Sequence, residues 1–264
     1  MTAGAGLHAP TSADSRELEG RVAVVTGGAS GMGLATAHAL ARRGATVAVF
    51  DRTAPGREEL ASMLAVPVDR VRSVAVDVTD GDRVRHTFAS LTKEQARLDI
   101  LVNAAGIAPP TAFEDIAEAE WNRVLAVNVH GTFLCCQQAL PAMRAGGWGR
   151  IVNFSSTAGK TISTAAGAHY TTAKHGVLGL TRHLAKAYGP DGVTVNAVCP
   201  GLIDTPMARG LLPEGSLDQV TRSFPVPRVG QPWEVAELVA FLASDRAAYI
   251  TGAAVDINGG DLIV

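Results

Sequence analysis

The sequence predicts an α/β fold: a doubly wound, seven-stranded parallel sheet with helices on both faces. Two observations support this prediction. Short runs of β-branched residues alternate with longer helical patterns from Arg21 onward, and each short run is nearly continuous in apolar residues. Strands that are buried on both faces have that composition, and right-handed crossovers between parallel strands distribute the helices over both faces. The 264 residues can bury a core that folds without disulfides or a structural metal.

The expected strands follow one another along the chain, with helical patterns between them. They cover residues 21–26, 46–51, 72–77, 99–106, 149–156, 193–200 and 253–259. One helix is expected to end at Arg43, and a later one is indicated by Val177, Leu180 and Leu184, which recur at helical spacing. Ligands bind at the carboxyl ends of the strands in such sheets, so the residues that follow each strand are the candidates for function.

Charge and hydropathy exclude several classes of protein. The chain has 23 Lys and Arg against 25 Asp and Glu, a formal net charge of -2 and a pI near 6.4. It therefore lacks the basic excess of a nucleic-acid-binding protein. No apolar run approaches the roughly 18 residues that a membrane helix requires. We expect neither a nucleic-acid partner nor a membrane partner.

The first residues mix Gly, Ala, Pro, Ser and Thr and lack the features of a secretory signal. We expect a mobile tail over 1–17, one folded domain over 18–264 and a cytoplasmic location. Cys135, Cys136 and Cys199 fit buried thiols in a reducing compartment. The seven histidines show no metal-ligand spacing, and no metal is predicted.

A glycine-rich loop follows the first predicted strand. Its sequence over residues 26–33, Thr-Gly-Gly-Ala-Ser-Gly-Met-Gly, permits a tight turn and lets the backbone approach a pyrophosphate at a helix N-terminus. A plain glycine-rich turn is the alternative, because the spacing differs from the strict Gly-x-Gly-x-x-Gly pattern. The cofactor-binding candidates in this loop are Gly27, Ser30, Gly31, Met32 and Gly33.

Asp51, at the end of the second predicted strand, indicates which dinucleotide the loop would bind. A carboxylate at this position can hold a ribose diol, and it would repel a 2′-phosphate. The glycine loop contains no Lys or Arg. The residues therefore favour NAD over NADP, although Arg52 argues the other way, and a solvated turn acid is the alternative interpretation of Asp51.

Tyr170 and Lys174 are four residues apart, which places a phenol and an ammonium on the same face of a helix. Free tyrosine has a pKa of about 10, and a general base at neutral pH needs it lowered by about three, which corresponds to about 4 kcal/mol. One cation at about 4 Å supplies roughly that energy at an effective dielectric constant of about 20. Taken alone, a tyrosine and a lysine at this spacing are common on helices and do not indicate a catalytic site.

Together these motifs resemble those of the short-chain dehydrogenase/reductase family. The resemblance covers about residues 18–264, and its motifs occur in the family's order, each after its expected strand. It implies a Rossmann-type sheet, a nicotinamide cofactor and hydride transfer to or from a small-molecule substrate. The motifs are the glycine loop, Asn103–Gly106 after the fourth strand, Asn128, Ser155–Ser156, Tyr170 with Lys174, and Pro200–Gly201.

The resemblance implies four catalytic residues. Tyr170 would be the acid/base, Lys174 would lower its pKa and bind the nicotinamide ribose, and Asn128 would hold a water that links Lys174 to solvent. The fourth is a serine that donates to the substrate oxygen. Matching from the strand side assigns that role to Ser156, fourteen residues before Tyr170, and the family's usual spacing of thirteen falls on Thr157.

The resemblance also implies further contacts with the cofactor. Asp77 and Val78 would bracket the adenine, and Asn103 would contact the adenine-side ribose. Pro200, Ile203 and Thr205 match the family's Pro-Gly-x-x-x-Thr motif, in which the backbone at Ile203 and the hydroxyl of Thr205 fix the carboxamide.

Residues 204–227 are expected to form the substrate lid, with a mainly apolar pocket that suits a cyclic or medium-sized secondary alcohol or its ketone. The first alternative is an NADPH-dependent 3-oxoacyl reductase acting on a carrier protein or coenzyme A thioester. The second is an NAD-binding regulatory protein without catalysis. The resemblance further implies a homo-oligomer, a tetramer before a dimer, built through two long helices near 113–143 and 168–188.

Overall fold

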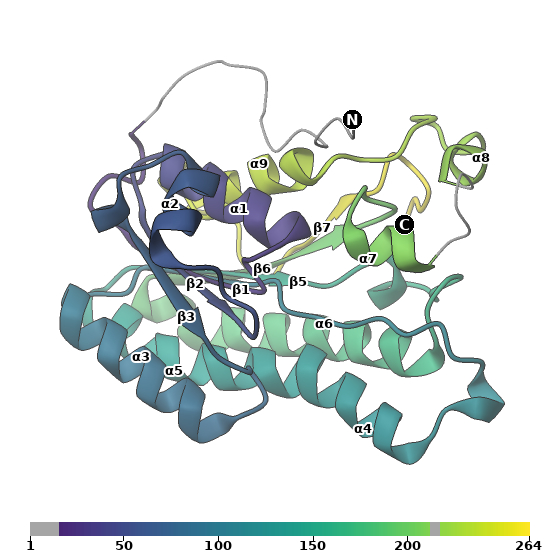
Figure 1. The fold of residues 1–264 in the computed structure, drawn as a ribbon, viewed down its shortest axis with the longest axis horizontal. Coiled ribbons are helices and arrows are strands. Elements are labelled where there is room, and N and C mark those ends of the chain that lie inside the picture. Colours follow the sequence, from purple (N-terminus) through teal and green to yellow (C-terminus); the bar gives the residue numbers. More distant parts are fainter. Residues whose placement is uncertain (1–15, 212–216) are drawn as a thin grey trace.

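The computed structural model describes residues 16–211 and 217–264 (Figure 1). The predicted lid lies partly outside these ranges, and the predicted tail lies outside them except for residues 16 and 17, where Glu17 forms an ion pair with Arg43. The strands are β1 (Val22–Thr26), β2 (Thr46–Asp51), β3 (Val71–Ala75), β4 (Ile100–Asn103), β5 (Gly149–Phe154), β6 (Val193–Pro200) and β7 (Ala254–Ile257). The helices are α1 (Gly31–Arg42), α2 (Arg57–Leu64), α3 (Gly81–Gln95), α4 (Glu118–Leu125), α5 (Gly131–Ala145), α6 (Ala168–Tyr188), α7 (Pro206–Leu211), α8 (Leu217–Thr221) and α9 (Pro232–Leu242).

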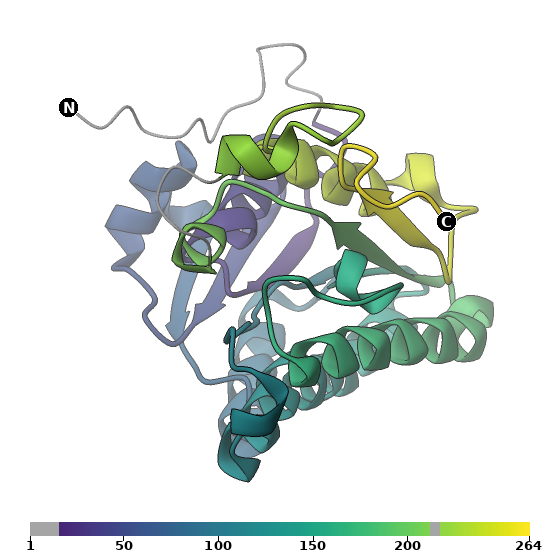
Figure 2. The same cartoon turned by 90° about the vertical axis from the view of Figure 1, so that its right-hand side faces the viewer.

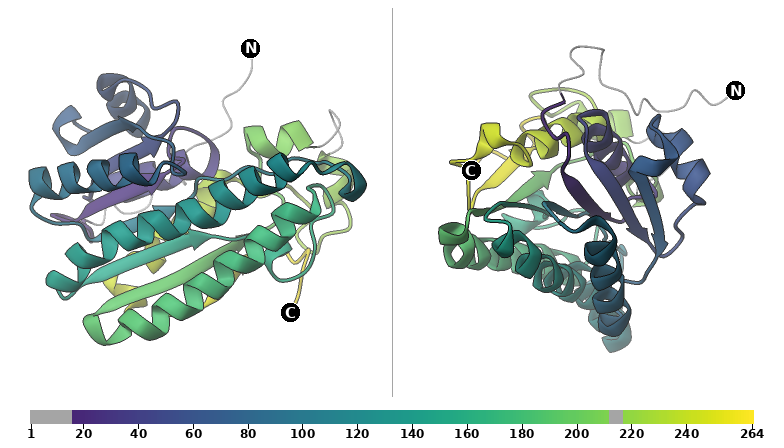
Figure 3. Two further views of the ribbon diagram at one scale, coloured as in Figure 1. Left: turned by 90° about the horizontal axis from the view of Figure 1, so that it is seen from below. Right: turned by 90° about the vertical axis from the view of Figure 1, so that its left-hand side faces the viewer.

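The strands form one parallel sheet in the order β3-β2-β1-β4-β5-β6-β7, which confirms the predicted fold class. Alternate residues of β1 enter two separate cores, with Ala23 and Val25 on one face and Val22 and Val24 on the other. Helices α1 and α9 cover the first face, and α3, α5 and α6 cover the second (Figures 1 and 3). Both faces are buried, as the near-continuous apolar strands predict.

The predicted long helix over 113–143 is interrupted in the structure. It consists of α4, a π-helical turn (Ala126–His130) and α5, which follow one another as a continuous rod beside α6 (Figure 3). The wide turn contains Asn128, and such turns in helices are frequent at functional sites. The other predicted long helix, 168–188, has the same bounds as α6.

The strand order reverses between β1 and β4, since the chain moves outward from β1 through β2 to β3 and then returns to β4 on the other side. A crevice opens at the carboxyl ends of strands at such a switch point, and ligands bind there. Helices α7 and α8 and the C-terminal segment gather at this edge of the sheet (Figure 2). Within 16–211 and 217–264, no helix is both long enough and apolar enough to cross a membrane.

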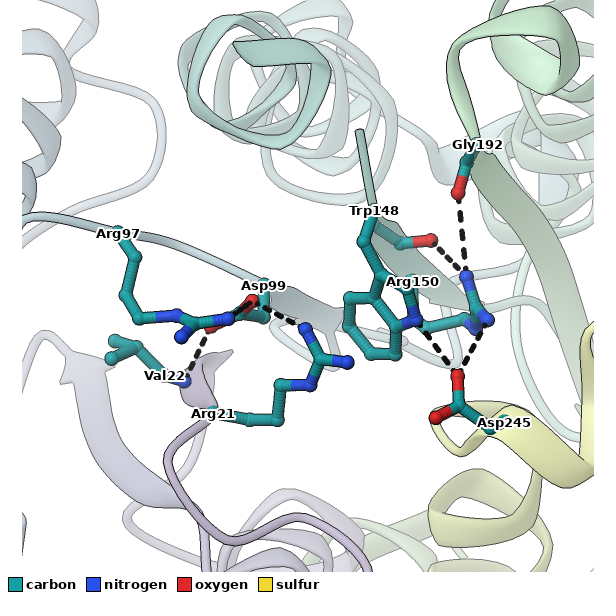
Figure 4. Close-up of polar contacts among 9 residues, drawn as sticks. Arg21, Val22, Arg97, Asp99, Trp148, Arg150, Gly192 and Asp245 are labelled. Carbon is teal, nitrogen blue, oxygen red and sulfur yellow. Dashed lines mark hydrogen bonds and ion pairs between the residues drawn. The ribbon is translucent and has the colours of Figure 1, made fainter. Parts of the chain in front are cut away.

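The opposite edge of the sheet carries a cluster of charged and aromatic side chains (Figure 4). The Trp148 ring lies between two guanidinium groups, 3.7 Å from that of Arg21 and 4.2 Å from that of Arg150. Trp148 Nε1 and Arg150 both donate to Asp245, and Arg21 donates to the buried Asp99. This cluster joins the starts of β1, β4 and β5, far from the carboxyl edge.

Candidate functional site

The glycine loop between β1 and α1 leaves room only for backbone. Gly27 has a φ of +64°, and a Cβ there would lie 2.8 Å from the Cα of Ala105. A Cβ at Gly33 would lie 2.1 Å from the carbonyl oxygen of Gly27. Gly31 also has a positive φ, +53°, and faces Thr205. This close approach of backbone at a helix N-terminus is what a pyrophosphate-binding loop requires.

A groove of about 280 Å³ lies above this loop. Many of the residues predicted to bind the cofactor meet here, although they come from separate segments of the chain. The predicted residues that line the groove are Gly27, Ser30, Gly31, Met32, Gly33, Asp51, Asp77, Val78 and Thr205.

Asp51 is fixed at one end of the groove by backbone donors. One carboxylate oxygen accepts a hydrogen bond from the N–H of Ala29 in the glycine loop at 3.2 Å, and the other accepts from the N–H of Thr53 at 3.1 Å. The carboxylate therefore lies beside the loop, at the place where a ribose diol would bind.

Asp77 shares that end of the groove with two arginines. Partial burial alone would raise the pKa of its carboxyl, but hydrogen bonds from Thr79 and the charges of Arg52 and Arg123 outweigh burial and hold the pKa below its ordinary value. Arg123 belongs to α4, and nothing in its local sequence indicates that it lies here, because its position depends on how α4 packs.

Ser156 and Tyr170 lie together at the other side of the site. The Ser156 hydroxyl accepts a hydrogen bond from the N–H of Ala158 at 3.1 Å, and it is also hydrogen-bonded to Tyr170. Burial raises the pKa of the Tyr170 phenol, and the bond with Ser156 offsets part of that rise. The strand-side assignment of Ser156 therefore agrees with the geometry, and Thr157 lines the same cavity without this contact.

Lys174 lies deeper than the phenol. Its ammonium donates to the carbonyl oxygen of Phe154 at 2.8 Å and lies 5.4 Å from the centre of the Tyr170 ring. Burial lowers the pKa of Lys174 to about 8. Burial is the largest influence on the Tyr170 phenol and raises its pKa, so the lowering of that pKa by Lys174 stays a prediction.

Asn128 lies next to Lys174 in the π-helical turn. Its side-chain amide donates to the carbonyl oxygens of Ile107 and Val124, both at 2.9 Å. Its buried Oδ1 has no hydrogen-bond partner among the described residues, and a Cβ at Gly106 would lie 2.7 Å from that oxygen and 3.6 Å from Lys174 Nζ. A buried oxygen that lacks a hydrogen-bond partner and lies near an amine can accept a hydrogen bond from a bridging water, which is the role predicted for Asn128.

His169 and Glu120 hold the start of α6. The side chain of His169 is fully buried, its Nδ1 accepts from the backbone N–H of Tyr170 at 2.9 Å, and its Nε2 donates to Glu120 at 2.8 Å. The side chain of Glu120 is thereby tied to the residue before Tyr170.

A second cavity, of about 440 Å³, adjoins the groove and shares Met32, Thr205 and Met207 with it. It contains Ser156 and Tyr170 on one side and an apolar wall on the other. Residues from the lid and the C-terminal segment form that wall: Met207, Ala208, Leu211, Val220, Phe224 and Leu262. The sequence indicated the lid but not the C-terminal segment, because only the pairing of β7 with β6 brings it here.

Besides Tyr170 and Lys174, three predicted cofactor residues do not line the groove: Asn103, Pro200 and Ile203. Asn103 is buried, and its amide donates to Asn153 at 2.9 Å across the β4–β5 pair, so its contact with a ribose stays a prediction. Pro200 ends β6 opposite Ile257. Ile203 is buried and lines the second cavity.

Comparison with known proteins agrees with this arrangement. A family model described as enoyl-(acyl carrier protein) reductase matches residues 27–261. The chain is 44% identical to cis-4-hydroxycyclohexanecarboxylate dehydrogenase of Sinomonas cyclohexanicum, over 91% of this chain and 96% of that protein. It is 36% identical to a 3-oxoacyl-[acyl-carrier-protein] reductase of Thermotoga maritima, over 93% of this chain and 99% of that protein. The crystal structure of levodione reductase matches with a TM-score of 0.85 at 34% identity, covering 92% of this chain and 98% of that one.

The fold and the site define a nicotinamide-dependent oxidoreductase of the Rossmann type. The chain belongs to the short-chain dehydrogenase/reductase family, which confirms the resemblance found in the sequence.

Proposed function

We propose that the protein is an NAD-dependent oxidoreductase that interconverts a secondary alcohol and a ketone on a small to medium, cyclic or largely apolar substrate. The observation that carries the proposal is the junction of the two cavities. Met32, Thr205 and Met207 line both cavities. The nicotinamide end of a dinucleotide bound in the groove would therefore reach the cavity that contains Ser156 and Tyr170. The names of the relatives agree, since they include a cyclic alcohol dehydrogenase and a levodione reductase.

In the proposed mechanism Tyr170 moves the proton. For ketone reduction its phenol donates a proton to the carbonyl oxygen, while the Ser156 hydroxyl donates a hydrogen bond to the same oxygen as negative charge develops. The nicotinamide, when bound, supplies the hydride to the carbonyl carbon. Oxidation reverses these transfers. Because burial raises the pKa of Tyr170, the phenol is protonated at neutral pH and is ready to act as the acid.

The residues at the adenosine end support NAD as the cofactor. Asp51 is held by backbone donors beside the glycine loop, where its charge opposes a 2′-phosphate. Gly27 and Gly33 leave no space for a side chain, which fits a pyrophosphate against the backbone. Lys174 would hold the nicotinamide ribose, and Thr205 the carboxamide.

A second candidate is an NADPH-dependent 3-oxoacyl reductase. It is favoured by Arg52 and Arg123, which line the groove near Asp77, and by the 3-oxoacyl reductase among the relatives. The position of Asp51 makes it the weaker candidate.

The test is reduced-cofactor formation from a panel of secondary alcohols, with NAD and NADP in parallel. We expect turnover with NAD, and we expect Tyr170→Phe to lower it by about 10²–10⁴-fold, the usual contribution of a positioned acid/base. NADH binding, followed by its fluorescence, should persist in Tyr170→Phe. Turnover with NADP alone would favour the second candidate, and NADH binding without turnover of any substrate would favour a regulatory role.

We also propose that the protein works in the cytoplasm as a homotetramer. The three free cysteines are all buried, which suits a reducing compartment. Phe133 on α5 is 40% exposed, on the rod formed by α4 and α5 that would face a neighbouring copy. Size-exclusion chromatography with light scattering tests the assembly.

A further inference from the structure

The substrate cavity has an unusual charge distribution. Among the described residues that line it, Asp261 is the one charged side chain. The other lining residues are apolar residues, glycine, or neutral Ser, Thr and Tyr. All 23 Lys and Arg belong to the described residues, because neither 1–15 nor 212–216 contains one, and none of them lines the cavity.

Arg222, between the lining residues Val220 and Phe224, is exposed and does not line the cavity, and two other basic residues near the lining are paired with acids. Arg209, in the lid, donates to Asp204 at 2.7 Å, and Lys160 donates to Asp256 at 2.7 Å. Neither cation is therefore placed to neutralise Asp261 or to receive a negatively charged substrate.

The position of Asp261 is fixed by the turn that contains it. The side-chain amide of Asn258 donates to the carbonyl oxygen of Leu262 at 2.9 Å and accepts from the N–H of Gly260 at 2.8 Å. The N–H of Asp261 donates to the carbonyl oxygen of Asn258. The N–H of Val226 donates to the carbonyl oxygen of Gly259 at 2.9 Å, so this turn is joined to the segment at Val226.

The opposite side of the cavity offers only neutral hydrogen-bonding groups. The loop before α6 contributes Thr161, Ser163 and Thr164 to the lining. Their hydroxyls can bind a second neutral oxygen on the substrate, but they do not offset the cost of burying a carboxylate or a phosphate.

We infer that this cavity selects uncharged ring alcohols and ketones, and that Asp261 is a specificity-determining residue that disfavours carboxylated rings and phosphate-bearing thioesters. The inference rests on the proposed function, which it deepens by naming the charge of the substrate. Its physical basis is the repulsion between the exposed Asp261 carboxylate and an anionic substrate in the cavity, together with the lack of a Lys or Arg among the described lining residues.

The experiment compares two ketones of the same shape, 4-oxocyclohexanecarboxamide and 4-oxocyclohexanecarboxylate. Binding of each is measured by calorimetry on Tyr170→Phe saturated with NADH, or with NADPH if that is the cofactor bound, so that no reaction is needed. Turnover of both is measured on the unmodified protein. We expect the amide to bind at least about fivefold more tightly, the effect of about 1 kcal/mol of repulsion.

Two variants separate the role of Asp261 from a general charge effect. Asp261→Asn should reduce the preference for the amide severalfold. Asp115→Asn, which removes the same charge from an exposed turn outside the cavity, should leave the preference unchanged.

The outcomes distinguish the inference from the proposed function. Equal or tighter binding of the carboxylate, no binding of either ketone, or an unchanged preference in Asp261→Asn would overturn the inference. A preference for the amide without turnover on the unmodified protein would uphold the inference and count against the proposed dehydrogenase.

Discussion

Lys174 is a buried amine whose titration should be visible in the stability of the protein. Burial lowers its pKa to about 8 in the folded chain, whereas the ordinary value is about 10.5. Below pH 8 the amine is charged in both states and the folded state bears the full cost of burying it. Above about pH 10.5 it is neutral in both states and the cost is absent. Between these values the unfolded chain binds more protons, so stability rises with pH.

We predict that the free energy of unfolding of the parent, minus that of Lys174→Met, increases by up to about 3 kcal/mol between pH 8 and pH 10.5. Urea unfolding at several pH values measures the difference. Lys93→Met, at an exposed position of α3, is the matched control and should show a flat difference. A flat profile for Lys174→Met would show that the buried amine keeps its ordinary pKa.

Ser156 and Thr157 compete for one role, and the structure favours Ser156 because it contacts the phenol. We predict that Ser156→Ala lowers kcat/KM by about 10²–10³-fold, as removal of a donor to a developing oxyanion does. Thr157→Val should lower it by less than about tenfold. Steady-state kinetics with the best alcohol of the panel measures both, and NADH binding should be unchanged in each variant. The reverse order of effects would place Thr157 in the catalytic role.

The residues that the sequence predicted well are those whose neighbours lie close in the chain. Tyr170 and Lys174 share one helix, so their spacing alone places them on one face. The pKa of Tyr170 was not predictable in this way, because it depends on burial by distant segments. The hydrogen bond between the side chains of Asn103 and Asn153 was not predictable for the same reason, because Asn153 is on a strand that follows two helices later.

At the scale of elements, the Glu120–His169 pair connects α4 to the first turn of α6. His169 accepts from the N–H of Tyr170, so the pair holds the backbone that carries the Tyr170 phenol. We predict that Glu120→Ala lowers the free energy of unfolding by about 1–3 kcal/mol, because it leaves a buried ring nitrogen without a partner. It should also lower kcat more than it raises KM, since Tyr170 is then less well positioned.

Glu120→Gln is the matched variant, because its side-chain oxygen can still accept from His169. It should recover most of the stability and of kcat. Chemical denaturation and steady-state kinetics on the two variants test this role. If Glu120→Ala retained full kcat, the pair would be a structural contact without influence on the phenol.

Elements that follow local patterns were predicted with few errors, and those that depend on packing were not. The bounds predicted for α6 and β6 agree with the structure. Near 113–143 the family resemblance implied one long helix, but the chain adopts a π-helical turn at Asn128, where the side-chain amide donates to two carbonyl oxygens. No residue pattern marks that turn, since the carbonyl of Ile107 arrives from another loop.

At the scale of the whole molecule, the residues proposed for chemistry and a cluster that stabilises the strands lie at opposite edges of the sheet. Its carboxyl edge contains the glycine loop, the groove above that loop and the cavity with Tyr170. Its amino edge contains the cluster around Trp148, which ties three strands together through two arginines and two aspartates (Figure 4). The strands span the distance between the two edges.

Because the two regions lie at opposite edges, a substitution at the amino edge should change stability but not cofactor binding. Trp148→Ala removes a ring that packs on the core and on two guanidinium groups, and it leaves Arg150 buried beside one remaining carboxylate. We predict a loss of about 2–4 kcal/mol in the free energy of unfolding, from the cavity and the lost cation–π contacts. NADH affinity and kcat below the unfolding transition should stay within about twofold of the parent, because the carboxyl edge is unchanged. Urea unfolding and fluorescence titration measure the two quantities, and a large loss of NADH affinity would show that the two edges are coupled through the sheet.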